Sequence, residues 1–203
     1  KVTGGKNGYG AKLANIFSTE FIVETVDTKQ KLKYRQIFRK NMSEKEEPVI
    51  TSYTGDSYTT IEFIPDFKRL GMEHLEEDIY FLMKKRAWDV AAWVGETVVV
   101  SFNGEPILIN NFKDYASMYI GDLKEVAYER CNRYWEVMAT YNADEKFEQV
   151  SFVNGINTIR GGKHVDYIVD QIKNGLVEWI KKNHKKTVKP IYVRNQLMVF
   201  VKC

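Results

Sequence analysis

Residues 4–17 read GGKNGYGAKLANIF, a glycine-rich stretch that runs directly into a helical pattern. Four of the first seven positions are glycine, and Leu13, Ile16 and Phe17 then share one face of an expected helix. Glycine lets the backbone adopt positive φ, and a helix start offers unpaired N–H groups that attract anions. Taken alone, the stretch is either a phosphate-binding loop or a tight turn between two elements.

The length and composition of the chain limit the classes of protein to which it can belong. The 203 residues suffice for one large or two small domains, and a hydrophobic content of 44% suffices for a packed core. We find no apolar run of about 18 residues and no leader-like start, so we expect no membrane partner. Because the chain starts at Lys1 rather than at Met, we expect it to be a piece of a longer protein.

Cysteine and histidine usage points away from metal chemistry. Cys131 and Cys203 form no disulfide framework and suit a reducing compartment. No CxxC spacing or His/Cys cluster predicts a metal site. His164, at the start of an expected helix, is expected to make a hydrogen bond there rather than to act as a base or ligand.

Positive charge gathers at the end of the chain. Residues 171–203 carry eight lysines and arginines against Glu178 alone, a net charge of +7, whereas the whole chain carries +3 and residues 1–170 therefore carry −4. Lys181, Lys182, Lys185 and Lys186 surround the end of an expected long helix. They are either a solvated, dipole-complementing helix end or a contact for a polyanion.

The remaining pattern mixes strands and helices without a regular alternation, which favours an α+β fold. We expect a domain boundary near residue 118, which gives domains 1–118 and 119–203. Strands are expected at 21–26, 31–38, 57–66, 133–141, 147–156 and 190–201, and a hairpin at 97–109 that turns at Asn103–Gly104. Helices are expected at 73–93, 110–120 and 164–183.

Three segments together resemble one family. Residues 1–21 (KVTGGKNGYGAKLANIFSTEF), 149–172 (QVSFVNGINTIRGGKHVDYIVDQI) and 180–201 (IKKNHKKTVKPIYVRNQLMVFV) resemble, in order, eukaryotic-type DNA topoisomerase II, a type IIA enzyme of the GHKL ATPase superfamily. The resemblance implies the latter part of a GHKL-type α/β sandwich, followed by a transducer domain with a ribosomal-protein-like βαβ fold. It covers essentially the whole chain.

The resemblance also implies an ATP site. Its triphosphate would be wrapped mostly by backbone N–H groups, and Thr59 would lie in the adenine pocket. Most relatives have arginine where this chain has Lys6, and lysine cannot grip a phosphate bidentately as arginine does. The residues so assigned are Lys6, Asn7, Gly8, Tyr9, Gly10, Ala11, Lys12 and Thr59.

The same resemblance assigns other functional groups and partners. The general-base glutamate and the Mg²⁺ ligand of the family lie upstream of such a loop, and its γ-phosphate lysine lies beyond residue 203. We therefore expect no catalytic residue in this chain, and no ATP hydrolysis by it alone. The four lysines would face DNA without sequence preference, and the parent would be a nuclear homodimer that closes on ATP.

Two rival functions are weighed against this one. Other GHKL ATPases, such as chaperones or mismatch-repair proteins, share the nucleotide loop, but the segment at 151–167 followed by a lysine loop argues against them. A non-enzymatic nucleic-acid-binding module would need only the basic end, and altering Gly8 or Gly10 would then affect stability alone.

Overall fold

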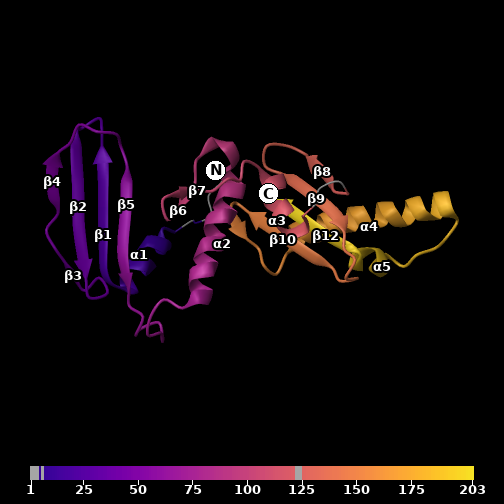
Figure 1. Ribbon diagram of the computed structural model, residues 1–203, viewed down its shortest axis with the longest axis horizontal. Helices are drawn as coiled ribbons and strands as arrows, with labels where there is room; N and C mark the ends of the chain where they lie inside the picture. Colours follow the sequence, from indigo (N-terminus) through magenta and orange to yellow (C-terminus); the bar gives the residue numbers. More distant parts are fainter. Residues whose placement is uncertain (1–4, 6, 122–124) are drawn as a thin grey trace. The chain divides into compact units, whose positions relative to one another are not determined.

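The computed structural model describes residues 5, 7–121 and 125–203, and it divides into two compact units. One unit is Gly5–Tyr80 and the other contains Phe81–Cys203, so each is described by itself (Figure 1). This division by contacts falls earlier than the domain boundary expected near residue 118. That boundary between domains 1–118 and 119–203 stays a prediction.

The first unit is an antiparallel sheet preceded by a short helix. The central strand β1 (Ser18–Asp27) pairs with β2 (Leu32–Arg39) on one side and with β5 (Thr59–Pro65) on the other. Two short strands, β3 (Glu44–Lys45) and β4 (Val49–Ser52), both pair with β2. Phe21 of β1 is 3% exposed and packs against Phe38 and Phe63 from the two flanking strands, which fixes the register of the sheet.

Helix α1 (Tyr9–Ile16) is joined to this sheet by Phe17, and Ser18 is the first residue of β1. The Ser18 hydroxyl donates to the carbonyl of Ala14, and the Asp66 N–H donates to the carbonyl of Phe17. The helix expected after the glycines is confirmed, but Leu13 on its apolar face is 53% exposed. Helix α1 is therefore held mainly through its C-terminal end.

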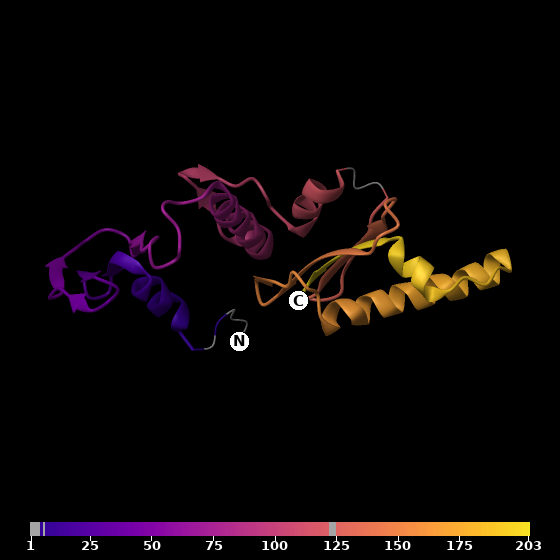
Figure 2. The ribbon, with the colours of Figure 1, turned by 90° about the horizontal axis from the view of Figure 1, so that it is seen from below.

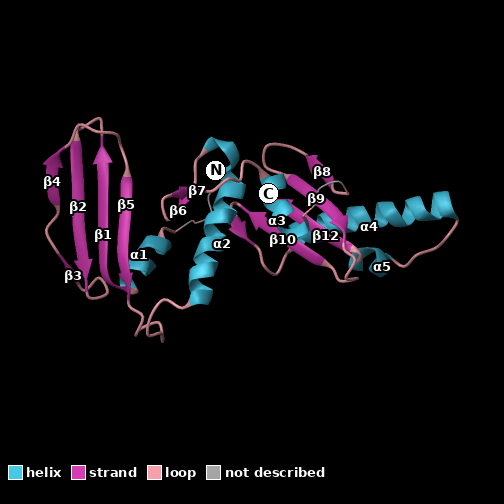
Figure 3. Cartoon of the chain, viewed as in Figure 1, coloured by secondary structure: helices cyan, strands magenta, loops and turns pink. Residues whose placement is uncertain are grey.

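The second unit is built on a mixed five-stranded sheet, in the order β11-β10-β12-β9-β8 (Figure 3). The strands are β8 (Ala127–Arg130), β9 (Glu136–Tyr141), β10 (Glu148–Val153), β11 (Ile156–Asn157) and β12 (Leu197–Lys202). Only the β10–β12 pair is parallel. Parallel neighbours need a long crossover, and helices α4 (Lys163–His184) and α5 (Pro190–Asn195) supply it.

Helices cover both faces of this sheet, as Figure 2 shows for α3 and α4. Strand β12 alternates accordingly: Phe200 faces helices α2 (Glu77–Val94) and α3 (Phe112–Ile120), whereas Val199 and Val201 face α4. All three of these β12 side chains are fully buried. A strand buried on both faces reads as a continuous apolar run, which LMVFV at 197–201 is.

Between α2 and α3 lie a 3₁₀ turn, Gly95–Thr97, and a two-residue hairpin. Its strands are β6 (Ser101–Phe102) and β7 (Glu105–Pro106). The turn expected at Asn103–Gly104 is confirmed, with φ of 53° and 84° at the two positions. Both values are positive, as the tight hairpin turn requires.

One expected strand is partly wrong. Residues 190–195 form helix α5 instead of the first half of a strand, and β12 begins only at Leu197. Pro190 occupies the first turn of α5, where its missing N–H costs no hydrogen bond. Strands β3, β4 and β8, each of two to four residues, lie where no strand was predicted.

Candidate phosphate-binding loop and basic helix end

Gly8 is the residue that turns the chain into α1. It is the N-cap, with φ 66° and ψ 16°, and among the described residues no side chain caps the helix start. A Cβ built at Gly8 would meet nothing within 4 Å, so the need for glycine there is conformational rather than steric. The first N–H groups of α1 therefore remain available as donors, and the helix dipole adds positive potential at the same end.

The predicted phosphate ligands lie around this helix start. Asn7, Tyr9, Gly10, Ala11 and Lys12 are all exposed, and the phenol ring of Tyr9 is 62% exposed. Lys6 lies outside the described residues. The structure thus presents a backbone donor set with an adjacent lysine, an arrangement that fits a phosphate group.

Thr59 lies elsewhere on the first unit. It opens β5 and pairs across the sheet with Thr25, and the two hydroxyl oxygens are 2.9 Å apart. The other end of β5, at Pro65, pairs with Ser18 directly after α1. Among the described residues, the recorded side-chain hydrogen bond of Thr59 is to Thr25 and not to the glycine loop. Its assignment to an adenine pocket stays a prediction.

The four lysines of the basic end cluster at the C-terminus of α4. Lys181 and Lys182 are in its last turn, and Lys185 ends the helix in the left-handed conformation, with φ 57°. The Lys185 N–H donates to the carbonyl of Lys181 at 3.2 Å, which continues the helical hydrogen-bond pattern to the C-cap. All four side chains are exposed.

Positive charge outweighs negative charge at this end, where Glu178 is the one carboxylate among residues 171–203. None of the four lysines forms an ion pair within the part of the chain that the structure describes. Lys181, Lys182 and Lys185 line a shallow depression of about 500 Å³ together with Glu178 and Thr187. A patch of this kind attracts phosphates by charge and carries no base-reading geometry.

His164 has a structural partner. Its Nε2 lies 3.0 Å from the hydroxyl of Thr158, across the start of α4, which agrees with the hydrogen bond expected there. Burial lowers the pKa of His164, although Asp166 opposes the shift. Among the described residues, no group of three His, Cys, Asp or Glu side chains is placed to hold a metal ion.

Comparison with known proteins agrees with the architecture. A family model described as DNA gyrase B matches residues 111–203. The chain is 46% identical over 211 residues to DNA topoisomerase 2 of Arabidopsis thaliana, and 44% identical over 222 residues to that of Saccharomyces cerevisiae. These alignments cover 99% and 100% of this chain. Over its whole length, the chain is therefore similar to one segment of DNA topoisomerase II.

Solved structures of topoisomerase II show which segment of the enzyme the chain resembles. The ATPase region of the Saccharomyces cerevisiae enzyme matches with a TM-score of 0.89 and 45% identity. The ATPase and transducer domains of the Balamuthia mandrillaris enzyme match with a TM-score of 0.91 and 45% identity. Each match covers 100% of this chain and 53% of the solved one. The mixed α/β fold is therefore that of the topoisomerase II ATPase region, which confirms the expected fold class.

The chain is short relative to the curated proteins that it matches. It spans 14% of the length of the Arabidopsis thaliana protein and 15% of that of the Saccharomyces cerevisiae protein. No helix in the described ranges is both long enough and apolar enough to cross a membrane.

Proposed function

We propose that the chain is part of the ATP-operated gate of a type II DNA topoisomerase. The observation that carries the proposal is the left-handed Gly8 at the uncapped start of α1, in a chain that matches the topoisomerase II ATPase region along its whole length. Backbone N–H groups at this helix start, with Lys12, would hold the triphosphate. Such preorganised donors stabilise phosphoryl charge without reorganising.

ATP, bound with Mg²⁺, would supply the free energy that closes and reopens the gate of a nuclear homodimer. The residues of this chain would bind and orient the phosphates, and the Mg²⁺ ligand and the general base would come from upstream. Hydrolysis would be coupled through the second unit to the passage of one DNA duplex through another. The four lysines at the end of α4 would contact the DNA backbone.

The test is binding of a non-hydrolysable ATP analogue to the parent protein, compared with its Gly8→Val variant. A β-branched residue at φ 66° is strained by roughly 1–2 kcal/mol and pushes the loop out of shape. We expect Mg²⁺-dependent binding and dimer closure in the parent, and their loss in the variant. A Gly8→Asn variant is the control, because asparagine adopts the left-handed conformation more readily.

The rival reading, a module that binds nucleic acid through the basic end alone, makes the opposite prediction. In that case Gly8→Val would lower stability without changing any binding activity. Neutralising the four lysines would then abolish every measurable binding. Equal nucleotide binding by the parent and by Gly8→Val would likewise reduce the glycine loop to a structural turn.

A further inference from the structure

A pocket of about 650 Å³ lies within the second unit, away from every residue assigned above to ATP or DNA. Helix α2 forms one wall, the last turn of α3 contributes Tyr119, and strands β10 and β11 with the loop to Ile159 form the opposite wall. Its volume is in the range of sites that hold small molecules. None of the glycine-loop residues that the structure describes lines it.

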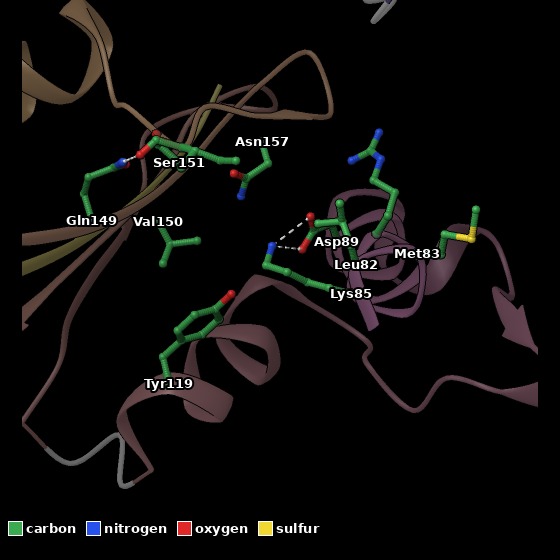
Figure 4. A pocket seen from close by; sticks show the side chains of 11 residues that line it. Leu82, Met83, Lys85, Asp89, Tyr119, Gln149, Val150, Ser151 and Asn157 are labelled. Atoms are coloured by element: carbon green, nitrogen blue, oxygen red, sulfur yellow. Dashed lines mark hydrogen bonds and ion pairs between the residues drawn. The ribbon is translucent and has the colours of Figure 1, made fainter. Parts of the chain in front are cut away.

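The polar groups of the pocket converge from three elements. In Figure 4 the Lys85 ammonium, the Tyr119 hydroxyl and the Asn157 amide point toward the space between α2 and β10. The Lys85 ammonium lies 2.9 Å from a carboxylate oxygen of Asp89, which is only 3% exposed. The side chains are thus held in place before any ligand arrives, which lowers the entropic cost of binding.

A chain of hydrogen bonds through two tyrosines of α3 holds the Asp89 carboxylate in place. The Tyr115 hydroxyl donates to Asp89 at 2.6 Å, and the Tyr119 hydroxyl lies 2.8 Å from that of Tyr115. Burial and the hydrogen bond to Asp89 raise the pKa of Tyr115 well above its usual range. Tyr115 therefore stays a protonated donor, and Asp89 accepts hydrogen bonds from both Tyr115 and Lys85.

The charge of the lining is positive. Lys85 and Arg86 together carry two positive charges and Asp89 carries one negative charge. Arg86 donates from one guanidinium nitrogen to the carbonyl of Gly155 at 2.8 Å. No other partner of its guanidinium is recorded within the described residues. Since a neutral carbonyl does not neutralise the guanidinium, Arg86 retains capacity for an anion.

A buried acceptor in the opposite wall lacks a donor. The amide nitrogen of Gln149 donates to the carbonyls of Thr158 and Ile159, at 3.2 and 2.9 Å, which fixes the orientation of the amide. Its Oε1 is buried and has no hydrogen-bond partner within the described ranges. Buried polar atoms are nearly always paired, so this oxygen can accept a further hydrogen bond, from a donor other than the carboxylate of a ligand.

Apolar side chains complete the lining. Leu82 and Met83 of α2 are 59% and 46% exposed, and Ile159 is 81% exposed. Three large apolar side chains at the mouth of one pocket favour a ligand with a flat apolar body.

We propose that this pocket binds a small organic anion: an aromatic or other apolar body with a carboxylate-like group held by Arg86 and Lys85. Such a ligand would bridge α2 to the β10–β11 hairpin. Its apolar body would lie against Leu82 and Ile159, where it covers surface that is otherwise exposed to water. The site does not depend on the proposed nucleotide function, because no described residue of the glycine loop contributes to it.

The test uses two probes of nearly equal size, 2-naphthoate and 2-naphthamide, which differ in charge and in the two N–H donors of the amide. Binding to the full chain is followed by amide chemical shifts in NMR. We expect saturable shifts along α2, β10 and β11, with naphthoate bound about tenfold more tightly, as for one charge-assisted hydrogen bond. Arg86→Gln should weaken naphthoate about tenfold and leave naphthamide unchanged within roughly twofold.

Matched variants distinguish binding in the pocket from nonspecific binding to the protein surface. Ile159→Ser removes an exposed apolar wall without disturbing the core, and it should weaken both probes several-fold. Lys84→Gln and Ile156→Ser alter neighbouring positions outside the lining and should change neither affinity. The proposal is overturned if no saturable shifts appear at millimolar probe, if naphthamide binds as tightly as naphthoate, or if the control variants weaken binding equally.

Discussion

At the scale of single residues, the decisive features are conformations and proton equilibria rather than contacts. His164 is an example. In the neutral form, Nε2 of its partly buried ring shares a hydrogen bond with the Thr158 hydroxyl, 3.0 Å away, and which atom donates depends on the tautomer. Burial lowers its pKa below the usual value of 6.5. The unfolded chain therefore binds a proton more readily than the folded chain between these two pKa values.

The sign of the pH dependence follows from this difference. The stability contributed by neutral His164 is fully present above about pH 6.5 and is lost as the pH falls through the lowered folded-state pKa. We expect His164→Gln to flatten the decline in unfolding free energy over that window, because glutamine stays neutral. Urea unfolding at several pH values checks this. Identical pH profiles for the two proteins would contradict the account.

Some residues could be predicted from sequence and others could not. The unusual backbone conformation at Gly8 could be predicted because several glycines precede a helical pattern. The basic patch could be predicted because four lysines lie within six positions of the sequence. The buried pair of Asp89 and Tyr115 lies 26 positions apart in the chain, and its hydrogen bond depends on how α2 packs against α3. Only the i, i+4 spacing of Lys85 and Asp89 was visible beforehand.

At the scale of elements, the end of α4 concentrates the charge. Each lysine that contacts a DNA phosphate displaces counterions, so the logarithm of affinity falls with the logarithm of salt concentration by roughly 0.9 per contact. Changing Lys181, Lys182, Lys185 and Lys186 to glutamine should reduce the salt slope of the parent protein by up to about 3.6. Fluorescence anisotropy with a DNA duplex at graded salt concentrations measures it.

The control for this prediction is a second set of charges on the same helix and the strand after it. Lys173 is paired with Asp170, and Lys202 lies 3.0 Å from Glu136. Because these lysines are already compensated, their replacement by glutamine should leave the salt slope unchanged. An equal loss of salt slope in both sets of variants would show that DNA binding depends on the net charge of the protein. It would contradict a specific role for the lysines at the end of α4.

Helix α5 shows why an element could be predicted only in part. Its sequence, PIYVRN, is rich in β-branched and aromatic residues, which favour strands. Proline at the helix start and the packing of Val193, which is 8% exposed, outweigh that propensity. Longer elements such as α4 were predicted well because their apolar period extends over five or six turns. Strands of two residues, such as β3, have no period to detect.

At the scale of the whole molecule, the two units have separate cores. Both apolar clusters of the sheet built on β12 lie entirely within residues 88–201, and Phe21 with its aromatic neighbours lies within the first unit. Such units unfold independently when few contacts join them. The α+β class could be predicted from the order of elements, but the division after Tyr80 could not, because it falls inside a continuous helix.

Tryptophan fluorescence offers a direct check. All four tryptophans, at positions 88, 93, 135 and 179, belong to the second unit. We expect a chain of residues 73–203, which keeps α2 whole, to show the same tryptophan unfolding midpoint in urea as the full chain. Circular dichroism of the full chain should report an additional transition from the first sheet. A lower midpoint after removal of residues 1–72 would contradict independent folding.

The position of β12 in its sheet has a consequence for synthesis on the ribosome. Strand β12 lies between β10 and β9, which are translated much earlier. Residues 154–196 must be translated after β10 before β12 can appear, which takes about 2–9 s at roughly 5–20 residues per second. During that interval β9 and β10 both have an unpaired edge, because the position of β12 between them is empty. This sheet is therefore most vulnerable to aggregation and to chaperone capture in the interval before β12 is made.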